Sequence, residues 1–305
     1  MKKRIAVIGG GWASEREISL KSARAVFDAL DRGKYDVSYY EIDRDLDLLF
    51  REREKIDLAF PLLHGKKGED GAIQGFLKIL GIPFVGSDIL ASSLAMNKKF
   101  SKRLFKESGI DVPDAVFLEK GRDFSVSEII NKLGIPVVVK PLSEGSSFGV
   151  SICRDEREIK EGIQDAFRFD EEVLIEEYID GKEITAPVIG KKELEVLPLV
   201  EIVPKEGFFS FEAKYKPGMA EEICPARISP EQEKKAKDVA KKAFRALGCN
   251  VWARVDMILK EEKVYVLEVN TIPGMTETSL FPLSAKKAGM SFSELLDRLI
   301  SLSLE

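Results

Sequence analysis

Apolar positions in the first third of the chain repeat with two different periods, one of two residues and one of about 3.6 residues. The first period is typical of strands and the second of amphipathic helices. Strands are predicted at residues 4–10, 36–42 and 57–63, and helices at residues 15–30 and 71–80. This alternation predicts βαβ units with a parallel sheet, whose loops at the carboxyl ends of the strands form the usual ligand crevice.

Beyond residue 96 the same patterns predict further elements, separated by two irregular loops. The first group is a helix at 97–108, a strand at 135–141, a Gly/Ser loop at 143–152 and a strand at 173–179. The second group is a set of strands near 183–203, an irregular loop at 205–227 and a helix at 230–248. We therefore expect an α/β protein of three lobes, with domains at residues 1–97, 98–180 and 181–305.

Residues 251–270 carry polar groups on strands that otherwise read as buried. The segments "VWARVDMIL" and "KVYVLEVN" flank the polar "KEE", which predicts a hairpin. A turn centred near residue 262 makes the numbers of cross-strand partners sum to about 524. Asp256 then faces Glu268, and Arg254 faces Asn270. Side chains alternate along a strand, so these four share one face, while Val255, Met257, Leu267 and Val269 share the other.

This polar face has two interpretations. Carboxylate and amide oxygens suit Mg²⁺, which fills its remaining positions with phosphate and water. Alternatively, Arg254, Asp256 and Glu268 form a buried ion cluster without a metal. The hairpin alone does not decide between them.

Composition narrows the class of protein. The chain has 305 residues, a net charge of -5 and no basic stretch that would predict nucleic-acid binding. Its three cysteines, Cys153, Cys224 and Cys249, have neither disulfide-framework nor metal spacing, so we expect a cytoplasmic protein. The start "MKKRIAVIGGG" is better explained as a buried strand than as a signal peptide, and no segment has the ~20 apolar residues of a membrane span.

Six motifs, in order along the chain, resemble the D-alanine:D-alanine ligase family of ATP-grasp enzymes. They are "GGWASEREISL", "HGKKGEDGAIQG", "KPLSEGSSFGVS", "EEYIDGKEIT", "EAKYKPG" and "ARVDMIL" with "LEVNTIPGMTETSL". The resemblance implies a three-lobed ATP-grasp fold, with an N-terminal parallel α/β domain and ATP between the central and C-terminal domains. It also implies ligation of two D-alanines through an acyl phosphate, for peptidoglycan precursors. We expect a homodimer, with D-alanine and ATP as small-molecule partners.

The resemblance assigns residues to ATP and to two Mg²⁺ ions, with Mn²⁺ as an alternative. Lys98 and Lys140 match the family's phosphate-binding lysines. Glu176 would lie near the exocyclic amine of adenine and Glu183 on the ribose hydroxyls. The interdomain segment that reads the adenine edge through its backbone continues through Glu177, Tyr178 and Ile179. The metal ligands implied by the family are Asp256, Glu268 and Asn270.

Further matches concern the two amino acids. Arg254 and the N–H of Gly274 match the donors to the oxyanion of the tetrahedral intermediate. Ser279 and the N–H of Leu280 correspond to the clamp on the second alanine's carboxylate. The remaining matches are Glu15 for the first alanine's ammonium, His64 for a contact with the first alanine, Ser146 and Tyr215 for closing two loops over the substrates, and Lys214 for supporting the phosphates or the closed loop.

Some features depart from the family or allow another function. The family usually has Ser, Asp and often Tyr at the positions of Ala13, Asn97 and Phe209. Ligases that join D-alanine to D-lactate or D-serine commonly replace the tyrosine that matches Tyr215, so "AKY" favours the dipeptide. A nicotinamide-dependent oxidoreductase is a remote alternative, because "IAVIGGGWAS" follows a strand but lacks the third glycine of the dinucleotide fingerprint. A binding module that has lost catalysis would be expected to lack charged site residues, and none of the matched ones is missing.

Overall fold

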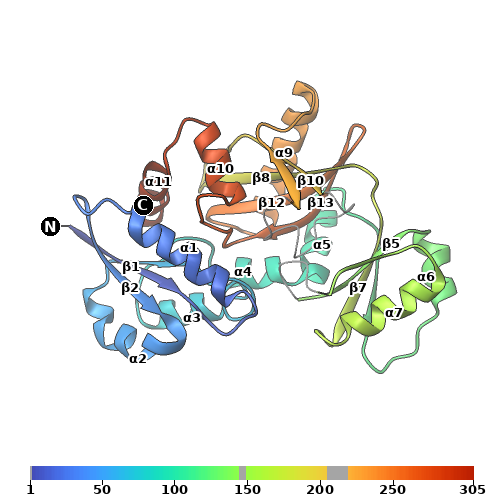
Figure 1. The fold of residues 1–305 in the computed structure, drawn as a ribbon, viewed down its shortest axis with the longest axis horizontal. Helices are drawn as coiled ribbons and strands as arrows, with labels where there is room; N and C mark the ends of the chain where they lie inside the picture. Colours follow the sequence, from blue (N-terminus) through green and yellow to red (C-terminus); the bar gives the residue numbers. More distant parts are fainter. Residues whose placement is uncertain (1, 144–148, 205–218) are drawn as a thin grey trace.

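The computed structural model describes residues 2–143, 149–204 and 219–305, which form three lobes (Figure 1). The N-terminal lobe is coloured blue, the central lobe green, and the C-terminal lobe yellow to red. None of the helices in these ranges is both long and apolar enough to cross a membrane.

The N-terminal lobe is built on a parallel sheet, as predicted, with the strand order β2-β1-β3. Its strands are β1 (Lys3–Gly9), β2 (Tyr35–Glu41) and β3 (Leu58–Pro61). Its helices are α1 (Arg16–Ala29), α2 (Ile42–Glu52) and α3 (Ala72–Ile79), with a short 3₁₀ helix η1 (Arg53–Lys55). Strand β1 is buried from Ile5 to Gly9 because helices cover both faces of the sheet.

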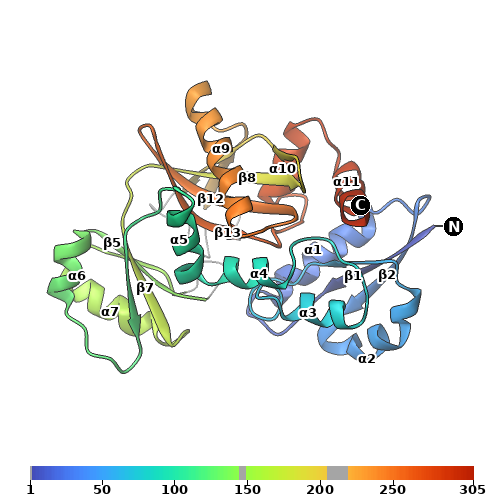
Figure 2. The same cartoon turned by 180° about the vertical axis from the view of Figure 1, so that it is seen from behind.

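Two helices connect the N-terminal lobe to the others, and Figure 2 shows them from behind. They are α4 (Ile89–Met96) and α5 (Lys98–Glu107). Asn97 separates them and caps α5, because its side-chain oxygen accepts hydrogen bonds from the N–H groups of Lys99 and Phe100 at 3.1 and 3.2 Å. The asparagine therefore supplies the cap that an aspartate would give.

The central lobe is a four-stranded antiparallel sheet in the order β4-β7-β5-β6, covered on one face by two helices. Its strands are β4 (Ala115–Glu119), β5 (Val137–Pro141), β6 (Ser151–Cys153) and β7 (Glu172–Glu177). Its helices are α6 (Val126–Leu133) and α7 (Glu156–Ala166). Val137, Val139, Val173 and Ile175 face the helices, so the alternate residues of β5 and β7 face the opposite side.

The C-terminal lobe is an antiparallel sheet in the order β11-β10-β8-β12-β13, with β9 paired to β8. Its strands are β8 (Lys182–Gly190), β9 (Leu194–Val196), β10 (Val200–Pro204), β11 (Ala220–Ile223), β12 (Val251–Lys260) and β13 (Lys263–Asn270). Its helices are α9 (Pro230–Ala246), α10 (Leu280–Lys287) and α11 (Phe292–Leu304). The expectation of an irregular segment through residue 227 was wrong for β11, which pairs with β10 over four residues.

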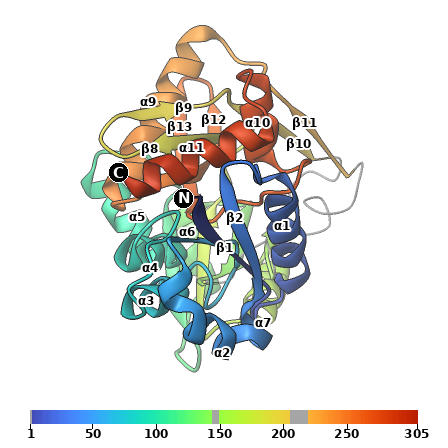
Figure 3. The same ribbon diagram turned by 90° about the vertical axis from the view of Figure 1, so that its left-hand side faces the viewer.

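The last helix packs on the first sheet, so the two ends of the chain share one core (Figure 3). Leu295, Leu296 and Leu299 of α11 belong to the same buried cluster as Ile5 and Val7 of β1. Trp252 of β12 lies in this cluster, edge-on to Phe60 of β3 and to Phe281 of α10. The N-terminal and C-terminal lobes are therefore joined by continuous apolar packing.

Candidate active site

The polar hairpin face forms as predicted, with the help of an irregularity that was not predicted. Asp256 pairs with Glu268 and Arg254 with Asn270, so both pairs of numbers sum to 524. Nearer the turn, Lys260 pairs with Lys263 and Met257 with Val266, and these numbers sum to 523. A β-bulge at Leu267 absorbs the difference. If the ladder kept the sum of 523, Leu267 would stand opposite Asp256.

The two faces of the C-terminal sheet have different chemistry. Val255, Met257 and Val269 are buried against helix α9, together with Val266. Val266 thus takes the core position that was predicted for Leu267, which is only partly buried. The opposite face carries the charged residues of the hairpin, so one side of the sheet holds the lobe together and the other is available for ligands.

Asp256 is the centre of a hydrogen-bond network on this face. Its Oδ1 accepts from Arg254 Nε at 2.9 Å and from Thr185 Oγ1 at 2.5 Å. Its Oδ2 accepts from Arg254 Nη2 at 2.8 Å and from Asn270 Nδ2 at 2.9 Å. The carboxylate is buried, and the fork-shaped contact with Arg254 satisfies both of its oxygens. In this state Arg254 pairs with a metal-ligand candidate, as the ion-cluster interpretation requires.

The donors on this face nevertheless fit a hard cation. Lys98 Nζ lies 3.5 Å from Glu268 Oε2, so ammonium and guanidinium groups both face the two carboxylates. Two carboxylates and an amide oxygen are the ligands that Mg²⁺ prefers. No group of three or more His, Cys, Asp and Glu side chains within the described ranges could hold a metal. The three metal-ligand candidates of the hairpin include only two acids, Asp256 and Glu268, because the third candidate is Asn270.

Glu183 lies on the same sheet face as the metal-ligand candidates. Thr185 of β8 stands opposite Asp256, and Glu183 is two residues further along the same strand. Side chains two residues apart share a face. The sheet therefore places Glu183 on the face of the hairpin acids, and its predicted contact with the ribose stays a prediction.

The central lobe brings together Lys140 and Glu176, the predicted phosphate lysine and adenine acid. Both project from the sheet face opposite α6 and α7, because Val138 pairs with Glu176 and lies two residues from Lys140. Lys140 Nζ forms an ion pair with Glu176 Oε2. The other oxygen, Oε1, pairs with Lys102 Nζ from helix α5. Lys102 was not predicted as part of the site.

In the segment after Glu176, some backbone N–H groups already form hydrogen bonds with other residues of the protein. The N–H of Glu177 donates to Asp114 O at 3.0 Å, and that of Tyr178 donates to Pro136 O at 3.2 Å. Glu177 Oε1 accepts from Asp114 N at 2.9 Å, and Ile179 is buried. These contacts hold the connection between β7 and β8 against the central lobe. Two of the N–H groups that could read a base edge are therefore already used.

Glu15 is buried at the start of α1, at the carboxyl end of the parallel sheet. Ser14 Oγ donates to Glu15 Oε2 at 3.2 Å. Gly65 makes room for this carboxylate, since a Cβ at Gly65 would lie 2.4 Å from Glu15 Oε2 and the backbone there has a φ of +69°. The glycine of the "HGKKGED" motif thus allows a loop after β3 to approach an acid after β1.

His64 has protein partners on both ring nitrogens. Nδ1 lies 3.0 Å from Ile272 O, so Nδ1 carries the proton, and Nε2 lies 3.4 Å from Ser22 Oγ. Burial lowers the pKa of His64 to about 4, which makes the ring neutral near pH 7. The structure therefore shows His64 joining the N-terminal lobe to the 271–279 loop. Its predicted contact with D-alanine stays a prediction.

Glu69 makes a second connection between the same two loops. Its carboxylate accepts from Gly65 N at 2.9 Å and from Ile272 N at 3.4 Å. Burial, and to a smaller extent the nearby Glu15, raise the pKa of Glu69 to about 7. Two acids of the N-terminal lobe therefore meet at the crevice, where a positively charged ammonium group would be favoured.

The oxyanion and carboxylate-clamp candidates lie together after β13. A Cβ at Gly274 would be 3.0 Å from Ser279 Oγ, so the two residues are close neighbours. Ser279 is the N-cap of α10, and Leu280 is its first residue, as the sequence suggested. Thr276 N and Thr276 Oγ1 lie 3.1 and 2.8 Å from Ser279 Oγ. An anion placed here would meet the N-terminus of a helix.

Three predicted site residues, Ser146, Lys214 and Tyr215, lie outside the described residues, as does Phe209. Their roles therefore remain predictions from the resemblance. Two other charged residues, Lys102 and Glu69, belong to the described site but were missed. Glu69 falls within the quoted motif "HGKKGEDGAIQG", which was a usable signal. Lys102 lies in a lysine-rich helix, where no pattern separates a buried lysine from exposed ones.

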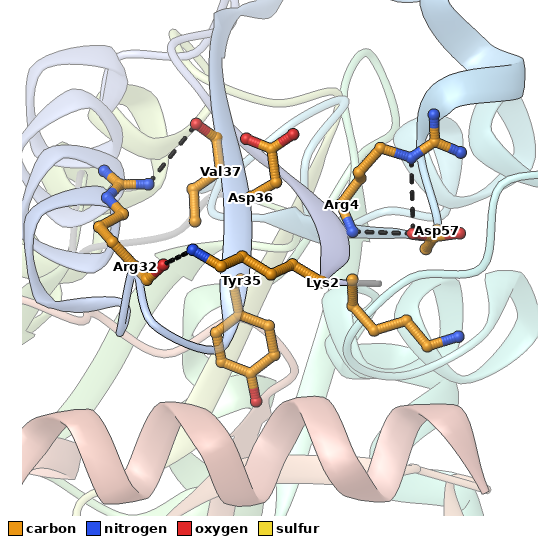
Figure 4. A pocket seen from close by; sticks show the side chains of 8 residues that line it. Lys2, Arg4, Arg32, Tyr35, Asp36, Val37 and Asp57 are labelled. Atoms are coloured by element: carbon orange, nitrogen blue, oxygen red, sulfur yellow. Dashed lines mark hydrogen bonds and ion pairs between the residues drawn. The ribbon is translucent and has the colours of Figure 1, made fainter.

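A separate cavity of about 900 Å³ lies at the amino ends of β1 and β2, at the opposite edge of the parallel sheet (Figure 4). Its lining is rich in cationic side chains, but several already have partners. Lys2 donates to Arg32 O at 2.5 Å, and Arg4 pairs with Asp57 (Figure 4). Ligand crevices of parallel sheets lie at the carboxyl edge instead. The candidate site is therefore placed at the carboxyl edge of the parallel sheet, around Glu15, His64 and the hairpin.

Comparisons with known proteins identify the family that the chain resembles. Residues 104–301 match the family model described as "D-ala D-ala ligase C-terminus", and residues 4–52 and 47–87 match "D-ala D-ala ligase N-terminus". The chain is 47% identical to a protein named D-alanine--D-alanine ligase from Syntrophobacter fumaroxidans, over 100% of this chain and 98% of the relative. Identity to the protein of that name from Carboxydothermus hydrogenoformans is 46%, over 99% and 98% of the two chains.

Two solved structures are also similar to the chain. One is the D-alanine--D-alanine ligase from Bacillus anthracis complexed with ATP, with a TM-score of 0.87, 38% identity, and coverage of 99% of this chain and 97% of that one. The other is the VanG D-Ala:D-Ser ligase from Enterococcus faecalis, with a TM-score of 0.86, 36% identity, and coverage of 99% and 100%.

Proposed function

The chain belongs to the D-alanine–D-alanine ligase family, and from this premise we propose that it joins two D-alanines with hydrolysis of ATP to ADP and phosphate. The observation that carries the proposal is the polar face of the β12–β13 hairpin. It places Arg254, Asp256, Glu268 and Asn270 together, next to Lys98, on the ligand side of the C-terminal sheet. This arrangement suits the positioning of a triphosphate beside a carboxylate that accepts its phosphoryl group.

In the first step, a carboxylate oxygen of the first D-alanine attacks the γ-phosphorus of ATP and displaces ADP. The lysine ammonium groups of Lys98 and Lys140 would hold the phosphate oxygens. Asp256, Glu268 and Asn270 would hold two Mg²⁺ ions, or Mn²⁺. The bound metal would supply Lewis-acid stabilisation of the phosphoryl oxygens. On the nucleotide, Glu176 would face the adenine amine and Glu183 the ribose.

In the second step, the neutral amine of the second D-alanine attacks the carbonyl carbon of the acyl phosphate. Phosphate leaves, and the attacking nitrogen loses a proton as the amide forms. Arg254 and the N–H of Gly274 would stabilise the developing oxyanion. Glu15 would hold the first ammonium, and this cation would favour the ionised form of the nearby Glu69, whose pKa is raised to about 7 in its absence. Ser279 and the N–H of Leu280 would hold the second carboxylate at the start of α10.

In this state Arg254 is paired with Asp256. For the proposed role, Arg254 must give up part of that contact when a cation neutralises the carboxylate. A cation at Asp256 would replace the charge that Arg254 now supplies, so the exchange is electrostatically reasonable. The ion cluster and the metal site are then two states of the same face.

A ligase that joins D-alanine to D-serine is the second candidate, favoured by the similarity to the VanG D-Ala:D-Ser ligase. The identities to proteins named D-alanine--D-alanine ligase reach 47%, compared with 36% for VanG, which supports the dipeptide of D-alanine. We further propose a cytoplasmic homodimer that supplies peptidoglycan precursors. The proposed domain boundaries remain near residues 97 and 180.

The test is ligation by the purified protein with ATP, Mg²⁺ and single or paired amino acids. Phosphate release and product mass identify the reaction. With D-alanine alone we expect D-alanyl-D-alanine and stoichiometric ADP. Faster formation of a mixed product from D-alanine with D-serine or D-lactate would replace the proposal with the second candidate, and release of phosphate without any dipeptide would overturn both.

A further inference from the structure

We propose that Lys102 is a positioning residue for nucleotide binding. It neutralises the oxygen of Glu176 that does not pair with Lys140, and thereby leaves the charge of Lys140 available to the phosphates of ATP. This inference rests on the proposed function only in that the chain binds ATP. Lys102 would not touch the nucleotide. It would act through Glu176 on the lysine that does.

The geometry places one carboxylate between two buried ammonium groups. Glu176 is 1% exposed, and its two oxygens pair separately with Lys102 and Lys140. Lys102 is 3% exposed, and its Nζ also donates to Pro113 O at 3.2 Å. The three groups come from three elements, since Lys102 lies on α5, Lys140 on β5 and Glu176 on β7. A helix that connects two lobes is thereby joined to the sheet of the central lobe.

The charge of this cluster explains why two lysines are needed. A single buried pair of Glu176 and Lys140 would be neutral, and the carboxylate would attract the whole of the Lys140 charge. With Lys102 present the cluster has one net positive charge, and Glu176 divides its attraction between two partners. Charges in a buried site act strongly on each other because little water screens them. Lys140 is thus easier to redirect toward a phosphate.

The pKa shifts of Lys102 and Glu176 are consistent with a carboxylate that is shared between two lysines. Burial lowers the pKa of Lys102, although Glu176 opposes this. Burial alone would raise the pKa of Glu176, but Lys102 and Lys140 outweigh burial and lower it. Glu176 therefore stays ionised because it has both partners. Lys102 depends on the carboxylate in the same way, because among the described residues Glu176 is the acid with which it forms an ion pair.

The simpler explanation is that Lys102 only stabilises the fold. Removing it would then lower thermal stability, with no specific effect on ATP. The two explanations differ for the double variant that lacks both Lys102 and the charge of Glu176. That variant again has one net positive charge, on Lys140, and no carboxylate to hold that lysine back. Our proposal predicts that Lys102→Met weakens ATP binding only while Glu176 is charged, so the double variant should bind ATP as tightly as Glu176→Gln alone. A purely structural ion pair predicts no specific effect of Lys102→Met on ATP binding in either background.

The experiment compares Lys102→Met, Glu176→Gln and the double variant, with Lys106→Met as a matched control. Lys106 is on the same helix, but its ion pair with Asp114 is exposed. ATP affinity is measured by calorimetric titration without amino acids, and KM for ATP and kcat are measured in the ligation assay. We expect Lys102→Met to weaken ATP binding and raise KM by about tenfold, with a much smaller change in kcat. The double variant should bind ATP as tightly as Glu176→Gln alone, because any loss of the adenine contact is common to both, and Lys106→Met should resemble the wild type.

Unchanged ATP affinity in Lys102→Met would overturn the proposal, as would an equal loss of affinity when Lys102→Met is added to Glu176→Gln. If Lys102→Met does not fold, the double variant and Glu176→Gln decide, because neither leaves the Glu176 carboxylate without Lys102. Equal ATP affinity in these two variants then supports the proposal, and a further tenfold loss in the double variant refutes it. Wild-type protein that binds ATP but ligates other amino acids would change the proposed function and leave this inference intact.

Discussion

Arg254 shows how one side chain can satisfy two interpretations at the residue scale. Its guanidinium holds Asp256 through two hydrogen bonds, at 2.9 and 2.8 Å. A sequence pattern could place Arg254 and Asp256 on one face. It could not say whether the two side chains would bond to each other or would each face a ligand. That depends on side-chain conformation, which strand alternation does not determine.

Replacing Arg254 with alanine separates its two roles. If the oxyanion role is correct, we expect Arg254→Ala to fold, to bind Mg-ATP, and to lose about 10²-fold or more in turnover at saturating substrate. Thermal melts with and without Mg-ATP accompany the kinetics. A variant that melts early without the metal, recovers with it and then turns over normally would show that Arg254 only neutralises Asp256.

His64 and Glu69 should make opposite contributions to the pH dependence of stability. The pKa of His64 is lowered from 6.5 to about 4, so the unfolded state binds more protons between these values and acid destabilises the fold. The pKa of Glu69 is raised from 4.5 to about 7, so here the folded state binds more protons and acid stabilises it. Both residues tie the 271–279 loop to the N-terminal lobe, and their effects offset each other in the wild type.

Single variants should expose these two contributions. On going from pH 7.5 to 5, His64→Gln should gain about 2 kcal/mol relative to the wild type, and Glu69→Gln should lose about as much. Denaturant unfolding at the two pH values measures this directly. Parallel curves for the wild type and both variants would show that neither group titrates as the burial of its side chain implies.

At the scale of an element, the bulge in β13 is the feature of the hairpin that the sequence did not predict. Hairpin geometry predicted the pairs Asp256–Glu268 and Arg254–Asn270 correctly, but the turn was placed half a residue too far along the chain. Leu267 compensated for that error, because it adds one residue to one strand only. Apolar alternation predicts a strand and its faces, but a bulge depends on how the two ladders fit, which a single sequence does not show.

The bulge predicts different outcomes for a deletion and an insertion at the same place. Deleting Leu267 leaves Glu268 opposite Asp256 in a regular ladder, so we expect a folded protein. Inserting an alanine after Leu267 would also give a regular ladder, but it would move Glu268 from opposite Asp256 to opposite Arg254, and Asn270 would move with it. The deletion should therefore keep the pairing of the metal-ligand candidates and their turnover, and the insertion should lose both. Ligation assays and thermal melts of the two variants test this, and equal turnover in two folded variants would contradict the proposed role of the bulge.

At the scale of the whole molecule, the lobes were easier to predict than the contacts between them. The sequence indicated a parallel sheet first and an antiparallel hairpin last, and both are present. It gave no sign that Trp252 would lie between Phe60 and Phe281, since each of these residues is simply apolar in its own element. The buried Lys102–Glu176 pair was missed for the same reason, because contacts between lobes leave no periodic pattern.

Trp252 should be the more important of the two tryptophans for stability. It is fully buried where β3, β12 and α10 meet, whereas Trp12 is 53% exposed. We expect Trp252→Ala to lower the free energy of unfolding by about 3–5 kcal/mol, and Trp12→Ala to change it by about 0.5 kcal/mol or less. Denaturant titrations of both variants supply the comparison, and similar losses in the two would contradict the assignment of Trp252 to a shared core.

The packing of α11 on the first sheet also bears on how a ribosome makes this protein. Strand β1 is synthesised long before Leu295, Leu296 and Leu299, which cover it. Until these residues are made, helix α1 covers only part of that apolar face of the nascent sheet. The growing chain therefore carries exposed hydrophobic surface while the central lobe and most of the C-terminal lobe are synthesised, and such surface promotes aggregation and is bound by chaperones. The N-terminal lobe has its full apolar cover only once α11 has been made.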